Sequence, residues 1–191
     1  MATSPSDRFY EIVRIAPSPE DPHYVQGCTA DLYFPVFGDV DLDRVAALGS
    51  MHVLLDVDGT LTATSGRISV DPRTKQKLQE IAKDPRFETL SLATENRAHA
   101  EDLLHNLGVA TTSLVFQPWE AGSLGTSWKT TERFWKKILF ELDCFDEPHK
   151  AVLIGDSLVR DIQPAQAAGM KTVLVDRIER RLRPRDSISF N

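Results

Sequence analysis

The sequence is poor in cysteine, has no excess of positive charge and contains no long apolar run. Cys28 and Cys144 are the two cysteines among 191 residues, and they match no metal-ligand spacing. Nothing argues for a disulfide between them, so a reducing compartment is the default. The net charge of −6 argues against a protein that coats nucleic acid. No window reaches the length of a membrane span, and the charged N-terminal region does not resemble a signal peptide. These absences predict a soluble, cytoplasmic protein.

Composition and the distribution of proline divide the chain into three parts. A hydrophobic content of 41% is enough for one sizeable core. Residues 1–40 are rich in proline, so we expect an irregular arm, with residues 10–15 as an optional short strand. The aromatic run at residues 32–37 is expected to pack on the core, with a docking patch as the alternative. Residues 41–176 should form the main domain. Residues 177–191 are an arginine-rich segment that is either solvated or in contact with anions or an acidic membrane.

From residue 41 onward, apolar runs typical of buried strands alternate with helical patterns. Asp71 followed by Pro72 is typical of a helix start, and Gly49 is typical of a helix end. This alternation predicts right-handed crossovers and helices on both faces of the sheet. We therefore predict an α/β fold, a three-layer Rossmann-like parallel sheet of about five strands. The strands are expected within residues 52–57, 88–94, 112–117, 151–156 and 171–175, and the helices within residues 41–49, 97–108, 131–145 and 164–169 and from residue 71 onward.

Polar residues occur at the ends of these predicted strands, where open parallel sheets carry their chemistry. Because these ends meet at one edge, we expect residues far apart in the sequence to converge there. Several carboxylates cannot crowd together without a cation, and oxygen ligands suit Mg²⁺. The residues are Asp56 and Asp58 after the first strand, Thr94 at the end of the second, Asp156 at the end of the fourth, and Lys129 before the long helix.

Gly59 indicates that the first strand breaks into a loop directly after the two aspartates. Residues two apart would share a face of a regular strand. The break lets Asp56 and Asp58 take different roles. One aspartate can act as a nucleophile, and the other can protonate a leaving oxygen and later activate water.

The segment "DVDGTLT" at residues 56–62 resembles the signature of the haloacid dehalogenase (HAD) superfamily of phosphohydrolases. The stretch "IGDSLVRDIQPAQAAGMKTVLV" at residues 154–175 fits the last of four motifs that occur in order. The resemblance implies a Mg²⁺-dependent phosphatase that forms a phospho-aspartate. It implies that Asp56 is the nucleophile and that Asp58 is the general acid and base. Thr94 and Lys129 would hold the phosphoryl oxygens. Asp56, Asp156 and the backbone carbonyl of Asp58 would bind Mg²⁺, and Asp161 would support the metal site.

The sequence departs from the pattern of this family at two positions. Glu95 follows Thr94, where many relatives carry asparagine. We expect Glu95 to point away, because a carboxylate would repel a bound phosphate. Thr130 follows Lys129, where relatives often have proline, so other lysines remain candidates for the same role. These are Lys136, Lys137 and Lys150.

Neither of the usual insertion points has room for a cap domain. About 10 residues separate Thr60 from Asp71, and a predicted helix and strand fill most of the chain between Thr94 and Lys129. A capless, open site suits a bulky substrate such as a lipid head group, a protein or a nucleotide. The layout loosely resembles the subgroup with phosphatidylglycerophosphate phosphatases, although those relatives often have asparagine where Gly59 stands.

Two other functions compete with phosphate-ester hydrolysis. A phosphoryl-transfer enzyme normally needs a cap to retain its intermediate. A catalytically weak phosphate-binding or interaction module would fit better if either Asp56 or Asp58 were missing, and both are present. The expected partners are a phosphate-ester substrate and, through the arginine-rich segment, a weak peripheral contact with an anionic membrane. The sequence does not set the oligomeric state.

Overall fold

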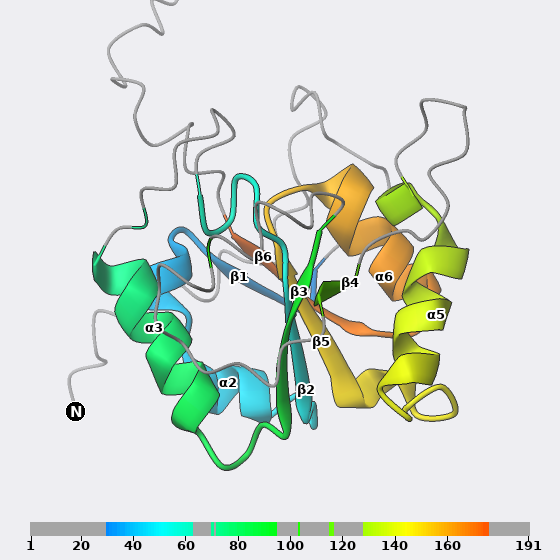
Figure 1. Cartoon of the computed structure of the whole chain (residues 1–191), viewed down its shortest axis with the longest axis horizontal. Coiled ribbons are helices and arrows are strands. Elements are labelled where there is room, and N and C mark those ends of the chain that lie inside the picture. Colours follow the sequence, from blue (N-terminus) through cyan, green and yellow to red (C-terminus); the bar gives the residue numbers. More distant parts are fainter. Residues whose placement is uncertain are drawn as a thin grey trace, which may run out of the picture.

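A parallel sheet lies between two layers of helices (Figure 1). The computed structural model of the chain describes residues 30–62, 70, 72–94, 103, 115–116 and 128–175. Within these residues the sheet has six strands in the order β1-β6-β5-β2-β3-β4, and neighbouring strands are parallel. The strands are β1 (Leu32–Phe34), β2 (His52–Leu55), β3 (Thr89–Ala93), β4 (Val115–Phe116), β5 (Ala151–Gly155) and β6 (Lys171–Val175).

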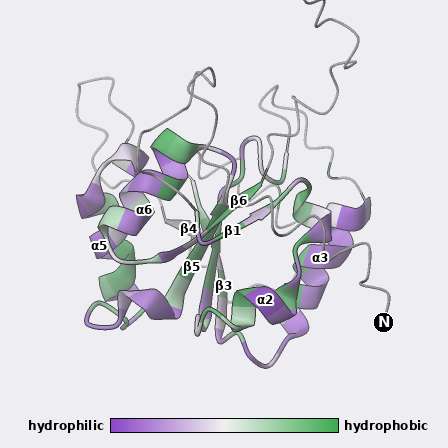
Figure 2. Ribbon diagram, turned by 180° about the vertical axis from the view of Figure 1, so that it is seen from behind, coloured by the Kyte–Doolittle hydropathy of each residue, from purple (hydrophilic) through white to green (hydrophobic). Residues whose placement is uncertain are grey.

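Helices cover both faces of this sheet. α2 (Leu42–Ala46) and α3 (Pro72–Lys83) lie on one side, and α5 (Glu132–Glu141) and α6 (Gln163–Ala167) lie on the other (Figure 1). The outer sides of the helices are mostly hydrophilic, and the strands between the layers are hydrophobic (Figure 2). Short helical turns complete the described chain: η2 (Phe37–Asp39), η3 (Trp128–Thr130), η4 (Pro148–Lys150) and η5 (Leu158–Ile162).

Each helical layer shares an apolar core with one face of the sheet. Leu55 of β2 belongs to the core that includes Leu78 and Ile81 of α3. Leu54, whose side chain points to the opposite face, belongs to the core that includes Trp135 of α5. β2 is therefore buried on both faces, as is typical of a central parallel strand. The residue that follows β2, Asp56, is buried as well.

Local capping explains where two of the helices begin. The side chain of Asp41 accepts hydrogen bonds from the backbone N–H groups of Asp43 and Arg44 at the start of α2. Thr131 does the same for Phe134 at the start of α5. Asp71, the predicted cap of α3, lies outside the described residues.

The predicted fold class is confirmed, and all five predicted strands are present. The structure differs from our expectation in one strand. Residues 32–34, which we placed in the irregular arm, form the edge strand β1 and pair with β6. Phe34 and Phe37 are buried, which confirms the core-packing interpretation of the aromatic run. Three residues are too few to show a strand period, so only the distant partner β6 defines β1.

Several predictions fall on residues that the structure does not describe. These are the optional strand at 10–15, most of the helix at 97–108, the position of Glu95 and the arginine-rich segment 177–191. The main-domain and arm boundaries also stay predictions. Among the described helices, none is both long and apolar enough to cross a membrane.

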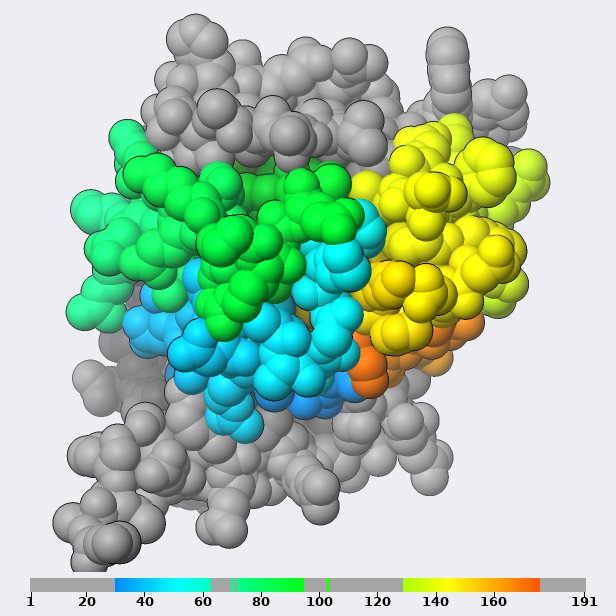
Figure 3. Space-filling view, turned by 90° about the horizontal axis from the view of Figure 1, so that it is seen from below, coloured from blue at the N-terminus to red at the C-terminus, as the bar shows by residue number. Residues whose placement is uncertain are grey.

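Three segments meet across the amino ends of the central strands. In the view from below, the green, cyan and yellow segments lie side by side (Figure 3). The N–H of Glu88 donates to the carbonyl of Met51 at 2.8 Å, and the N–H of Met51 donates to the carbonyl of Lys150 at 2.7 Å. His52, the next residue, is buried, and its Nδ1 lies 3.1 Å from Thr89 Oγ1. This end of the sheet is therefore closed by hydrogen bonds.

We expect His52 to make the free energy of unfolding fall on acidification. Burial lowers the pKa of His52; the charge of Glu88 opposes this shift and that of Lys150 adds to it. Below pH 6.5 this side chain binds a proton more readily in the unfolded chain than in the folded chain. The free energy of unfolding therefore decreases as the pH falls toward the folded pKa. Urea unfolding at pH 7.5 and 5.5 should show a smaller pH effect in His52→Gln than in the wild type. His149→Gln, at an exposed histidine, should behave like the wild type.

Candidate functional site

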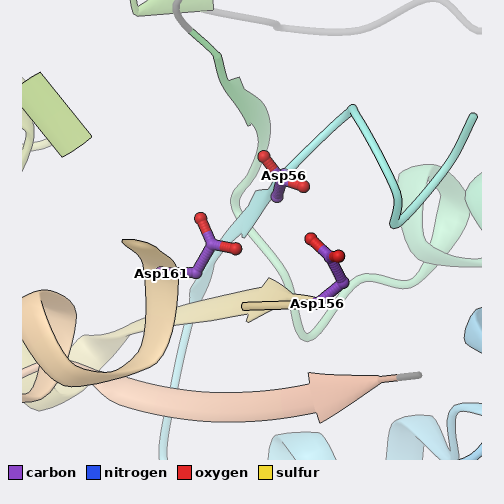
Figure 4. Close-up of side chains that lie close together, drawn as sticks. All are labelled: Asp56, Asp156 and Asp161. Atoms are coloured by element: carbon purple, nitrogen blue, oxygen red, sulfur yellow. The ribbon is translucent and has the colours of Figure 1, made fainter. Parts of the chain in front are cut away.

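Three aspartate side chains converge at the carboxyl edge of the sheet. Asp56 follows β2, Asp156 follows β5, and Asp161 lies in η5; their side chains gather around one small space (Figure 4). One carboxylate oxygen from each residue lies within 4.8 Å of the others. The pairing of the strands explains this convergence, because Leu55 lies opposite Ile154 and Asp56 still donates its N–H to the Ile154 carbonyl.

Lys129 lies against two of these carboxylates. Its Nζ contacts Oδ1 of Asp56 and is 2.7 Å from Oδ1 of Asp161. The lysine side chain is only 4% exposed, so these contacts are shielded from water. Thr60 adds a further contact, since its hydroxyl donates to Oδ2 of Asp56 at 3.0 Å. Asp56 therefore has a partner on each of its two oxygens.

Burial and charge shift the pKa values of this group. Burial raises the pKa of Asp56; the Lys129 ammonium opposes that shift and Asp156 adds to it. Burial and the charge of Asp56 raise the pKa of Asp161 to about 6, against the opposing effect of Lys129. Burial alone would lower the pKa of Lys129, but Asp161 and Asp56 outweigh it and raise the value. The carboxylates thus disfavour one another's charged forms.

The charges of the group fit a divalent cation. Three carboxylates and one ammonium give two more negative charges than positive ones. The candidate ligands are carboxylate oxygens, which Mg²⁺ prefers, and the half-buried Asp156 leaves one side of the group accessible. Asp56 and Asp156 could hold such an ion while Lys129 stays between Asp56 and Asp161.

The loop after β2 is tightly folded beneath this group. The N–H of Gly59 donates to the Thr62 carbonyl at 2.7 Å, and the N–H of Leu61 donates to the Val57 carbonyl at 2.9 Å. Gly59 has a φ of +96°, and a Cβ built there would lie 2.6 Å from Oδ2 of Asp156. Any other residue here would strain the backbone and push against the Asp156 carboxylate.

We expect Gly59→Ala to weaken Mg²⁺ binding roughly 10-fold or more, because its methyl group would displace the Asp156 carboxylate. The measurement is calorimetric titration with Mg²⁺. Gly49→Ala is the matched control: Gly49 also has a positive φ, +80°, but a Cβ there meets no atom within 4 Å. The control should lose stability and keep its Mg²⁺ affinity. Equal affinities in the two variants would contradict the expected displacement.

A helical turn of π type orients Asp161. The N–H of Ile162 donates to the Ser157 carbonyl, five residues earlier, at 3.1 Å. The side-chain hydroxyl of Ser157 accepts from the Arg160 N–H at 3.2 Å, and Oδ2 of Asp161 accepts from the Ser157 N–H at 3.1 Å. One oxygen of Asp161 is thus used to hold the turn, and the other faces Lys129.

The structure brings together most of the predicted site residues. Asp56, Asp156 and Lys129 meet as the strand ends suggested, and Lys129 is buried. The rival lysines are more exposed: their side chains are 48% (Lys136), 52% (Lys137) and 33% (Lys150) accessible, and each pairs with a glutamate. Of the four candidate lysines, Lys129 is therefore the one that contacts the aspartate group.

Thr94 and Asp58 lie at the same edge. Thr94 is buried and follows β3, where Leu92 is paired with Leu55, so it ends beside the start of the Asp56 loop. The carboxylate of Asp58 is not part of the three-aspartate group within the described residues. Its predicted metal contact is through the backbone carbonyl, which side-chain positions do not test. The chemical roles of all these residues stay predictions.

Two side chains make more contacts in the candidate site than the sequence indicated. Asp161 was predicted only to support the metal site, but its carboxylate is a member of the group. Thr60 was not predicted to contact Asp56 at all. Its position four residues after Asp56, in the loop after the strand, was the available signal, but nothing in the spacing shows where the hydroxyl points.

Comparisons with known proteins bear on the family and the fold of the chain. A family model described as "HAD-hyrolase-like" matches residues 129–180, which include Lys129, Asp156 and Asp161. A crystal structure of an uncharacterized protein from Listeria monocytogenes serotype 4b has the same fold, with a TM-score of 0.53 and 16% sequence identity over 73% of this chain and 85% of that one. No curated protein sequence matches the chain.

Proposed function

We propose that this chain, a member of the haloacid dehalogenase superfamily, is a Mg²⁺-dependent phosphatase that hydrolyses phosphate monoesters. Members of this superfamily are typically hydrolases. The observation that supports the proposal is the buried group of Asp56, Asp156 and Asp161 with Lys129 between two of its carboxylates. Enzymes that hydrolyse phosphate esters need positive charge and a nucleophile at the same point.

Each side chain then has a distinct task. An oxygen of Asp56 attacks phosphorus, forming a bond to the aspartate as the ester P–O bond breaks. Asp58 gives its proton to the leaving oxygen, and then takes one from the water that releases inorganic phosphate from Asp56. Lys129, already in contact with Asp56, neutralises charge on the phosphoryl oxygens, and Thr94 donates to them.

A bound Mg²⁺ would supply further positive charge to the phosphoryl group. Asp56 and Asp156 would hold it, together with the Asp58 backbone carbonyl. The burial of Asp56 makes these electrostatic contacts stronger than they would be in water.

The substrate is proposed to be bulky. A cap domain could be inserted between Thr62 and α3 or between Thr94 and η3. The first segment is short, and the second also contains β4, so neither has enough residues for a separate domain. An uncapped site fits a substrate that excludes water itself, such as a lipid head group, a protein or a nucleotide. The phosphatidylglycerophosphate phosphatases often have asparagine where Gly59 stands, so a lipid head group is only one of these three candidates.

The test of this function is hydrolysis of a panel of phosphate esters with Mg²⁺ and with EDTA. The panel should contain a generic aryl phosphate and lipid, nucleotide, sugar and phosphopeptide substrates. Release of inorganic phosphate from at least one ester, abolished by EDTA, is expected. Hydrolysis that EDTA does not affect would contradict the metal-dependent mechanism. A complete lack of hydrolysis, with Mg²⁺ still bound, would favour a binding module instead.

We expect Asp58→Asn to lower turnover roughly 10²-fold or more while leaving phosphate binding intact, because the amide can neither give nor take the proton. Steady-state kinetics and inhibition by inorganic phosphate measure the two quantities separately. Asp39→Asn, at a partly exposed carboxylate in η2, should keep wild-type turnover. Normal turnover in Asp58→Asn would remove this residue from acid–base catalysis.

A further inference from the structure

We propose that Trp135 is a positioning residue for Lys129. Its indole Nε1 donates a hydrogen bond to the Lys129 backbone carbonyl at 2.8 Å, and both residues are buried. The inference rests on the role proposed above for Lys129 in phosphate hydrolysis. Trp135, a core side chain of α5, would hold the Lys129 backbone in the position from which the lysine ammonium reaches Asp56.

The backbone of Lys129 needs such a contact. Lys129 lies in η3, a turn of three residues that belongs to no strand. Its carbonyl comes before Thr131, the N-cap of α5, and so lies outside the hydrogen-bond ladder of that helix. Thr130 follows and does not restrict its own φ as a proline would. The turn is therefore held in place by contacts with its surroundings.

Trp135 is a rigid anchor for that purpose. Its side chain is 0% exposed and packs in the apolar core that includes Leu54 of β2 and Leu153 of β5. Phe134 meets it edge to face, with the ring centroids 4.9 Å apart and an interplanar angle of 84°. Because Leu54 lies two residues before Asp56, the indole is fixed relative to the strand that carries the nucleophile.

The hydrogen bond thus links the sheet to the lysine through one side chain. β2 sets the position of Asp56, the core sets the position of the indole, and the indole sets the position of the Lys129 carbonyl. The long, flexible stem of lysine leaves its ammonium dependent on where the backbone starts. A shift of about 1 Å in a catalytic group can lower a rate roughly 100-fold.

Packing alone would not require the indole N–H. Phenylalanine would fill much of the same space, but it would leave the Lys129 carbonyl without this donor. Trp135→Phe therefore removes the hydrogen bond with a limited loss of packing. Ile138→Val is the matched control, because Ile138 lies on the same helix, is 1% exposed and belongs to the same core.

The experiment measures how readily Lys129 reacts in the full-length chain. Formaldehyde with cyanoborohydride methylates accessible amines, and mass spectrometry gives the rate at Lys129, with the exposed Lys136 as internal reference. Circular dichroism confirms that each variant is folded. In Trp135→Phe we expect the Lys129 rate to rise at least about threefold, because the turn opens more often. In Ile138→Val the rate should match the wild type.

Kinetics supply the second measurement. We expect kcat to fall in Trp135→Phe with Mg²⁺ affinity unchanged, and to fall no further when Trp135→Phe is added to Lys129→Met. Additive losses in the double variant would show that Trp135 does not act through Lys129 and would overturn the proposal. An unchanged labelling rate, or an equal rise in Ile138→Val, would overturn it as well. If the wild type hydrolyses no phosphate ester, the proposed function fails, and the labelling rates still decide whether Trp135 positions Lys129.

Discussion

Replacing Asp56 by asparagine should abolish phosphate-ester hydrolysis, with kcat lower by at least about 10³-fold. The amide oxygen is a poor nucleophile, so no phospho-aspartate can form. The change also removes a carboxylate from the group with Asp156 and Asp161, which should weaken Mg²⁺ binding. Steady-state kinetics on the best ester of the panel and calorimetric Mg²⁺ titration measure the two losses.

The fold should survive this substitution. Asparagine has nearly the same shape as aspartate, and removing one of three neighbouring negative charges relieves repulsion at Asp156. Asp146→Asn makes the same chemical change at an exposed residue of the loop before β5 and should leave both kcat and Mg²⁺ affinity unchanged. Activity of Asp56→Asn within about tenfold of the wild type would exclude Asp56 as the nucleophile.

Lys129→Met should lower the free energy of unfolding in EDTA by roughly 3–5 kcal/mol. Methionine replaces most of the volume of the lysine stem, so the main effect is electrostatic. The variant leaves the buried carboxylates of Asp56 and Asp161 without the ammonium that lies between them. Urea unfolding, with the midpoint and slope fitted separately, gives the loss of stability.

Mg²⁺ should restore part of this stability, because the ion supplies positive charge to the same carboxylates. Hydrolysis should stay low even when the variant is saturated with Mg²⁺. Lys136→Met is the control: Lys136 is about half exposed and pairs with Glu132 on the surface of α5, so the loss there should be below about 1 kcal/mol. Equal losses in the two variants would show that the contacts of Lys129 contribute no more than a surface ion pair.

The carboxyl-edge rule explains why much of the site could be predicted. The apolar runs that end at Leu55 and Gly155 indicated two strands, and adjacent parallel strands bring the next residues, Asp56 and Asp156, to one place. The helical pattern within residues 131–145 likewise indicated the helix that the structure shows as α5. These features depend on residues close together in the sequence.

The remaining features depend on contacts between distant residues. β1 exists because Leu32 lies opposite Val173 at the edge of the sheet. Asp161 joins the carboxylates because η5 winds by a π-type step, which residue patterns do not reveal. The sequence favoured Lys129 because it precedes the long helix, but it left three other lysines as candidates, and only burial separates Lys129 from them. Sequence therefore indicated the edge of the sheet where these carboxylates meet, and tertiary packing decided which side chains join them.

The central place of β5 in the sheet has a consequence for biosynthesis. β2 leaves the ribosome early, followed by Asp56, but the strand that must lie beside it is made about a hundred residues later. Until β5 and η5 have been translated and inserted, Asp56 has neither of its acidic neighbours. If the chain is the phosphatase proposed above, a nascent or C-terminally truncated chain that stops before residue 150 should release no phosphate, and hydrolysis would then report completed folding.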